Sequence, residues 1–430
     1  MKRLYAFLLA DIALGIAVHA AVPSYTNPIL PYDYSDPDVI RVGDTYVMTS
    51  SSFNNVPGLQ ILASKDLVHW EIVDAAIRYR LPGYEEGDKV AGNFVWAPAI
   101  REHDGRIWIY YGDPDRGIYC VRSKGQGTIH NSQFTILSPK GHDYLAKPNF
   151  HNLQFPLEWE EPVLVMPAKG YIDPCPLWDE DGRVWLSHGV AGSRFGLKSV
   201  LMMAELTADG MAVKTPSRII FDGHEEHPTS EGTKLYKRNG YYYIMHPAGG
   251  VATGWQVVQR SKNIYGPYEL KVTLAQGKTA INGPHQGGWV ETPEGEGFFM
   301  HFQDVGVAGR IVHMQPLKWE NDWPVMGNNG EPIEKYKGSR VGRISSAGMS
   351  STARSWHSTG SGQAEGSNRD GSSAMPPTAV SASIPYHAKR TNGCRTCCCR
   401  RSLLLLSLLQ RACGSPPTNT RKWLVPNKPE

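Results

Sequence analysis

The sequence predicts an all-β protein, a five-bladed β-propeller followed by a low-complexity C-terminal tail. Three observations lead to this fold class: a hairpin pattern that occurs five times, a repeat interval of 57–77 residues, and the lack of long amphipathic helical patterns between the copies. Such a long period, with several short strands in each unit, is typical of propellers, in which every blade is a four-stranded sheet around a central channel.

The clearest copy of the repeat spans residues 231–250. Its alternating run turns at Asn239-Gly240 and continues into the aromatic and aliphatic run 241–245. Alternation around an Asn-Gly turn indicates a β-hairpin. The turns of the other four copies are marked by Asp44, Asp104, Asp181 and Glu296.

The residues eight positions before the turn markers are the candidate functional residues. They are Asp36, Trp96, Asp173 and Glu231, and the looser fifth copy places His285 near the equivalent position. In a propeller the equivalent ends of the innermost strands meet at one mouth of the channel. Like charges gathered in a partly dehydrated space repel one another, so three carboxylates at one mouth indicate a functional site.

Paired carboxylates suit the hydrolysis of a glycosidic bond, in which one carboxylic acid protonates the leaving oxygen and a carboxylate activates water. Asp36 and Glu231 lie on blades that are not adjacent, so they are expected to face each other across the channel, as an inverting pair does. Asp173 is expected beside Glu231, where its negative charge would raise the pKa of the acid.

The motifs at these positions resemble glycoside hydrolase family 43, the five-bladed β-xylosidases and α-L-arabinofuranosidases. The motifs are Asp36-Pro37-Asp38, Trp96–Ile100, Ile172–Gly182, Ser230–Tyr243 and Asn282–Gly288. The resemblance implies that Asp36 is the general base and Glu231 the general acid. It also implies that Asp173 tunes the pKa of the acid and helps to orient the substrate.

The resemblance implies further roles around the mouth. Trp96 and Phe53 would line the sugar subsite, Arg310 would contact the substrate, and His285 would help to hold a structural calcium ion together with water. No cofactor is expected to be required. Similar family members carry a β-sandwich domain after the propeller, whereas this chain has the tail.

Each of these residues also has a simpler interpretation. Asp36 precedes a proline and could form a turn, and Glu231 could be an exposed strand end. His285 could be a hydrogen-bonding histidine without an ion, and Trp96 could serve in packing alone. The matching offsets in the repeats favour the functional interpretation for the carboxylates, and leave the role of Arg310 open.

The predicted domain organisation has three parts. Residues 1–21 have the sequence pattern of a signal peptide, in which Lys2 and Arg3 precede an apolar run. A secreted protein is therefore expected. Residues 22–340 form the propeller. The net charge of +3 is small and the basic residues of the propeller are scattered, which argues against a nucleic-acid partner.

The tail, residues 341–430, is interpreted as disordered, or as a wrongly predicted end of the gene, because it is rich in Ser and Gly. Its cysteines lack a second ligand pair with the spacing of a zinc site. Its Leu403–Leu406 run is too short to cross a bilayer, so no membrane partner is expected. Within the propeller, Cys120 and Cys175 could pair or remain two thiols.

The expected function is that of a secreted, inverting glycoside hydrolase that acts on plant cell-wall oligosaccharides or polysaccharides. It would release xylose from β-1,4-xylooligosaccharides, arabinofuranose from arabinoxylan, or both. The alternatives are arabinofuranosidase or arabinanase as the main activity, and a propeller that binds sugars without catalysis. The three carboxylates speak against the last alternative, because binding alone does not need an acid with a raised pKa.

Overall fold

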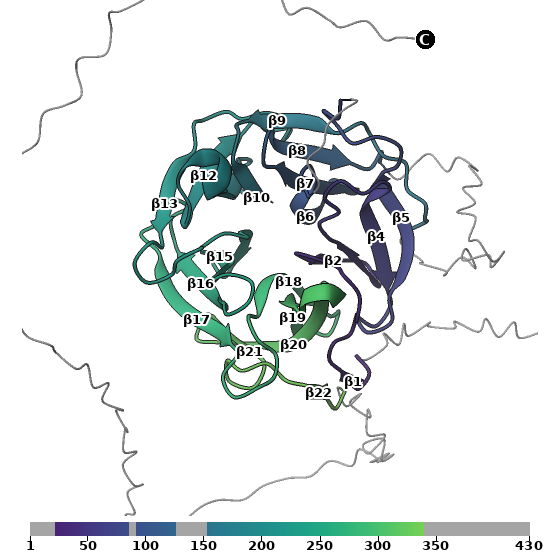
Figure 1. The fold of residues 1–430 in the computed structure, drawn as a ribbon, viewed down its shortest axis with the longest axis vertical. Coiled ribbons are helices and arrows are strands. Elements are labelled where there is room, and N and C mark those ends of the chain that lie inside the picture. The colour runs from purple at the N-terminus through teal and green to yellow at the C-terminus, as the bar shows by residue number, and fades with distance from the viewer. Residues whose placement is uncertain (1–21, 86–91, 126–152, 339–430) are drawn as a thin grey trace, which may run out of the picture. The chain divides into compact units, whose positions relative to one another are not determined.

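The computed structural model describes residues 22–85, 92–125 and 153–338. The predicted signal peptide, the predicted tail and most of the polar loop between the second and third repeats lie outside the described residues. Within them, five four-stranded sheets are arranged as blades around a central axis, which confirms the predicted propeller (Figure 1).

Each blade is an antiparallel sheet whose four strands lie side by side in chain order. Blades one and two contain β2 (Asp38–Val42), β3 (Thr45–Thr49), β4 (Gly58–Ser64) and β5 (Glu71–Ile77), then β6 (Trp96–His103), β7 (Arg106–Asp113), β8 (Gly117–Arg122) and β9 (Val163–Pro167). Blade three contains β10 (Tyr171–Trp178), β11 (Val184–Val190), β12 (Val200–Leu206) and β13 (Arg218–Asp222). Blades four and five contain β14 (Lys234–Arg238), β15 (Tyr241–Ala248), β16 (Trp255–Ser261) and β17 (Glu269–Ala275), then β18 (His285–Glu291), β19 (Gly297–Asp304), β20 (Arg310–Glu320) and β21 (Trp323–Met326).

The predicted turns connect the first two strands of each blade. Asn239 and Gly240 have φ angles of 49° and 74°, and Asp104 and Gly105 have 51° and 67°. Positive φ at both central residues defines the type I′ turn, whose twist matches that of the flanking strands. These turns therefore set the register of β14 with β15 and of β6 with β7.

The hydrophobic core lies between the blades, and β7 shows how it is built. Trp108 and Tyr110 pack into the cluster shared with blade three, whereas Ile107, Ile109 and Tyr111 pack into the cluster shared with blade one. Successive side chains of a strand point to opposite faces, so a strand covered on both faces is apolar throughout. The same arrangement produces a cluster in each of the other three spaces between blades.

The ring is closed by the segment that precedes blade one. Leu30 exchanges two backbone hydrogen bonds with Val312 of β20, at 3.3 and 3.0 Å. The Asn27 side chain donates to the carbonyl of Met314 and accepts from its amide, at 2.9 and 2.8 Å. Nearby, β1 (Tyr25–Thr26) pairs with β22 (Lys335–Tyr336), so the two ends of the described propeller meet (Figure 1).

The two cysteines of the propeller are both free thiols, which answers the question that the sequence left open. Cys120 lies in the cluster between blades two and three, and Cys175 lies in the cluster between blades three and four. No helix among the described residues is long and apolar enough to cross a membrane.

Candidate active site

The innermost strands are irregular at the positions that the repeat singled out. Asp36, just before β2, and Asp173, in β10, both have φ of 56°, in the left-handed region that non-glycine residues rarely occupy. The register of β10 shifts after Ile172, and that of β18 shifts after His285. Bulges and left-handed residues redirect side chains, and they are common beside active sites.

The carboxylate of Asp36 is held by two neighbours. Ser51 Oγ donates a hydrogen bond of 2.5 Å to Oδ2, and Arg310 Nη1 lies 3.5 Å from Oδ1. The side chain is only 8% exposed, so these contacts replace hydration of the charge. The sequence predicted a role for Arg310 but not for Ser51, whose only signal was its place in a serine run after β3.

Asp173 is buried and is held by the segment that follows Glu231. The amide of Gly232 donates to Asp173 Oδ2 at 2.7 Å, and Thr233 Oγ1 donates to the Asp173 carbonyl at 2.9 Å. Burial and the negative charge of Asp36 raise the pKa of Asp173 to about 7, against the lowering effects of the Gly232 amide and Lys234. The Asp173 carboxyl thus lies close enough to Glu231 for its negative charge to raise the pKa of Glu231.

Glu231 is the most accessible of the three carboxyls, with a side chain that is 27% exposed. Burial and the negative charges of Asp173 and Asp36 raise its pKa to about 8, while Arg310 acts in the opposite direction. A Cβ added at Gly189 of β11 would lie 3.5 Å from Glu231 Cα and 3.7 Å from Asp173 Oδ2. Glu231 and Asp173 are therefore neighbours. Because its pKa is raised to about 8, Glu231 carries a proton near neutral pH.

The mouth thus brings together Asp36, Asp173 and Glu231 with Arg310 and His285. His285 Nε2 lies 3.7 Å from Glu231 Oε1, and Arg310 acts electrostatically on both Glu231 and His285. Residues that are up to 274 positions apart in the chain meet in one place, as the predicted pseudo-symmetry requires.

Phe53 and Trp96 lie together on the wall between blades one and two. The backbone of Phe53 pairs with that of Val95 through hydrogen bonds of 2.9 and 3.1 Å. Trp96 Nε1 donates to the Gly92 carbonyl at 2.6 Å, and the Arg194 guanidinium lies 5.5 Å from the centre of its ring. Both aromatic residues are only partly buried.

His285 is buried, and neither of its ring nitrogens has a hydrogen-bond partner among the described residues. Burial, Arg310 and His301 lower its pKa to about 3, so the ring is neutral and keeps a lone pair. Calcium prefers six to eight oxygen ligands, and the described residues contain no group of three or more His, Cys, Asp or Glu that could hold a metal ion. This donor set does not fit a calcium site built from side chains, and a calcium ion bound largely through water stays a prediction of the resemblance.

The sequence matches the family description "Glycosyl hydrolases family 43" over residues 25–324, which include every residue of the mouth. The chain belongs to glycoside hydrolase family 43. It is 38% identical to a putative β-xylosidase of Xylanibacter ruminicola over 76% of this chain and 55% of that protein. It is 29% identical to xylosidase/arabinosidase 43B of Humicola insolens over 72% of this chain and 56% of that protein.

Solved structures of family 43 proteins share the propeller. The xylan β-1,4-xylosidase of Bacillus halodurans superimposes with a TM-score of 0.60 at 25% identity, over 74% of this chain and 59% of that one. A bifunctional protein of Bacteroides eggerthii gives a TM-score of 0.57 at 28% identity, over 74% and 37%. This family 43 chain spans a little more than half the length of the relatives in sequence that it matches.

The raised pKa of Glu231 predicts how Glu231→Gln affects stability. The native protein holds a proton that the unfolded chain releases, so wild-type stability falls as pH rises from about 4.5 through about 8. Glu231→Gln has no proton to lose at this position, so its stability does not fall in this way. In thermal unfolding, the Tm of the variant minus the Tm of the wild type should therefore be larger at pH 9 than at pH 5. Glu225→Gln, which changes an exposed carboxylate, serves as the control. A Tm difference that is equal at both pH values would contradict the assignment.

Proposed function

We propose that this family 43 protein is an inverting glycoside hydrolase that releases xylose from β-1,4-xylooligosaccharides. The observation that carries the proposal is the meeting of three carboxyls from different blades at one mouth, with a raised pKa on the most accessible one. Carboxyl groups that act as catalytic acids near neutral pH have a pKa that is raised in this way. The names of the relatives support the class of substrate.

Asp36 is the proposed general base. Its carboxylate accepts a hydrogen bond from Ser51 and lies beside Arg310, which hold it in place at the mouth. In the reaction it takes a proton from water as the water oxygen forms a bond to the anomeric carbon. Attack from the face opposite to the leaving group inverts the anomeric configuration.

Glu231 is the proposed general acid. It gives its proton to the glycosidic oxygen as the bond between that oxygen and the anomeric carbon breaks. Asp36 belongs to blade one and Glu231 to blade four, and blade five separates them around the ring. This separation suits an inverting pair, which leaves room for water between base and sugar.

Asp173 is proposed to keep Glu231 protonated through its negative charge and to help orient the sugar. Phe53 and Trp96 would pack against the apolar faces of the sugar rings, and Arg310 would donate to a sugar hydroxyl. Secretion by means of residues 1–21 and action on plant cell-wall polysaccharides belong to the same proposal.

Arabinofuranose is the second candidate product. Relatives include the xylosidase/arabinosidase of Humicola insolens and a non-reducing end α-L-arabinofuranosidase of Bacteroides ovatus that is 28% identical over 78% of this chain. Parallel assays on nitrophenyl xyloside and nitrophenyl arabinofuranoside, followed by defined oligosaccharides, decide between the two sugars. A protein that binds these sugars without cleaving them would be a carbohydrate-binding propeller instead.

Glu231→Gln tests the acid. Loss of general acid catalysis costs about 10²- to 10⁴-fold in rate, so kcat on xylobiose should fall by that order. A dinitrophenyl glycoside, whose leaving group needs little protonation, should lose much less. Glu225→Gln should leave both rates unchanged. If Glu231→Gln retains wild-type hydrolysis of xylobiose, Glu231 is not the acid.

Asp173→Asn tests the control of the Glu231 pKa. Without the neighbouring negative charge, the pKa of Glu231 falls from about 8, so the acid loses its proton at a lower pH. The alkaline limb of kcat/KM against pH should therefore move to lower pH, and turnover should slow. Asp181→Asn, at the exposed turn of the same blade, is the matched control. An alkaline limb that stays in place would remove this role from Asp173.

A further inference from the structure

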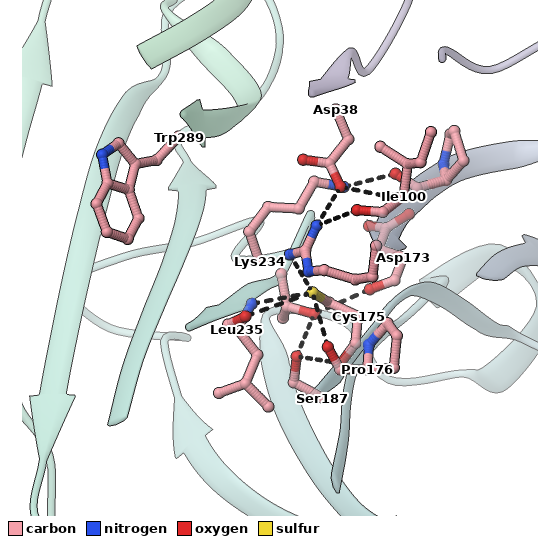
Figure 2. Close-up of polar contacts among 12 residues, drawn as sticks. Asp38, Ile100, Asp173, Cys175, Pro176, Ser187, Lys234, Leu235 and Trp289 are labelled. Atoms are coloured by element: carbon pink, nitrogen blue, oxygen red, sulfur yellow. Dashed lines mark hydrogen bonds and ion pairs between the residues drawn. The ribbon is translucent and has the colours of Figure 1, made fainter. Parts of the chain in front are cut away.

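A largely buried polar layer lies next to Asp173 of the mouth, on which its Lys234 acts electrostatically. It consists of Asp38, Arg101, Cys175 and Lys234, which come from the innermost strands of blades one to four. Figure 2 shows three of them, Asp38, Cys175 and Lys234, within one connected network. We refer to these four residues as the axial layer.

Within this layer Lys234 reaches from blade four to blade two. Its side chain is 1% exposed, its Nζ donates to the Pro98 carbonyl at 2.6 Å, and the same atom lies 3.9 Å from Asp38 Oδ2. In the pairing of β6 with β7, Trp96 pairs with Gly112 and Ala99 pairs with Tyr110, so Pro98 is left out of the pairing. The bulge thus leaves the Pro98 carbonyl outside the strand pairing, and Lys234 binds it.

The remaining contacts tie the layer together. Asp38 Oδ2 accepts hydrogen bonds from the Ile100 amide at 2.9 Å and from Arg101 Nη1 at 2.8 Å. Arg101 Nη2 and the Leu235 amide both donate to Cys175 Sγ, at 2.7 and 3.1 Å. Buried ion pairs contribute little net stability because desolvation opposes their attraction. A role in fixing geometry explains the layer better than a role in stability.

The layer is matched to the mouth in sequence. Three members of the layer follow a mouth carboxyl by two or three positions, in the pairs Asp36 and Asp38, Asp173 and Cys175, and Glu231 and Lys234. Pro98, whose carbonyl Lys234 binds, follows Trp96 by two positions. The two residues between Glu231 and Lys234 also donate hydrogen bonds to Asp173. Fixing Lys234 therefore fixes the backbone that carries Glu231.

Glu231 needs this support more than the other two carboxyls do. Asp36 accepts a hydrogen bond from Ser51, and Asp173 accepts one from Gly232. In the described parts of the chain no hydrogen bond reaches the Glu231 carboxyl, and the neutral ring of His285 lies 3.7 Å from its Oε1. The position of this carboxyl is set by its backbone.

We propose that Lys234 is a positioning residue, which holds the Glu231 carboxyl at the leaving-group oxygen through its ties to Pro98 and Asp38. The inference rests on the proposed role of Glu231 as the acid. Displacing a reacting group by about 1 Å costs on the order of 10²-fold in rate. Such a displacement would slow the transfer of the proton to the leaving group. The loss in rate therefore depends on how much protonation the leaving group needs.

The test is Lys234→Met, which keeps the length of the side chain and removes its charge and its donors. The kcat on xylobiose should fall by about 10²-fold with little change in KM, and the loss on a dinitrophenyl xyloside should be much smaller. Lys234→Arg, which keeps a cation, should retain a higher kcat on xylobiose than the Met variant. An equal loss on both substrates in a folded Met variant, or an Arg variant no better than Met, would overturn the proposal.

Lys237→Met is the matched control. Lys237 lies three positions further along the same strand and pairs with Asp179, away from the axial layer, so its replacement should affect neither substrate. If Lys234→Met does not fold, Asp38→Asn removes the charge that Lys234 faces and keeps an oxygen for the Ile100 amide. It should show the same dependence on the leaving group, and an equal loss on both substrates would overturn the proposal.

Glu231→Gln measured in parallel separates the two levels of the account. If that variant shows no dependence on the leaving group, the proposed acid itself is wrong. If Glu231→Gln shows the dependence and the folded Lys234 variants do not, the proposed function stands and the positioning role falls.

Discussion

The mutual repulsion of three carboxyls at the axis is the interaction on which the site depends. Burial and the charges of its neighbours raise the pKa of Glu231, and the same forces act on Asp173. A flexible chain would relieve the repulsion by moving the groups apart. The closed ring prevents this, because each carboxyl is carried by a blade packed on both faces. The protonated Glu231 is therefore a consequence of the rigid fold.

The sequence predicted the fold and the three carboxyls of the mouth because rotational pseudo-symmetry leaves a regular trace. Hairpin turns recur, and a fixed offset from each turn leads to Asp36, Trp96, Asp173 and Glu231 without any knowledge of contacts. Turn residues such as Asn239 report local backbone geometry directly. The family match over residues 25–324 agrees with this prediction of the fold.

The supporting residues could not be found in this way, because nothing in their local sequence marks them. Lys234 is one lysine in an alternating strand, and its partner Pro98 lies 136 positions earlier in the chain. Ser51 reaches Asp36 only because the chain turns back after β3, and the bulge in β6 that frees the Pro98 carbonyl has no sequence signal that we recognised. Pairwise contacts across the axis become visible only in three dimensions.

The central claim is that Asp36 and Glu231 act from opposite sides of the sugar, one on water and one on the leaving oxygen. Proton NMR of the first sugar released from a β-xyloside, recorded before mutarotation, tests it most directly. The account predicts that α-xylose appears first, since water attacks the face opposite to the leaving group. Initial release of β-xylose would show retention of configuration and would contradict it.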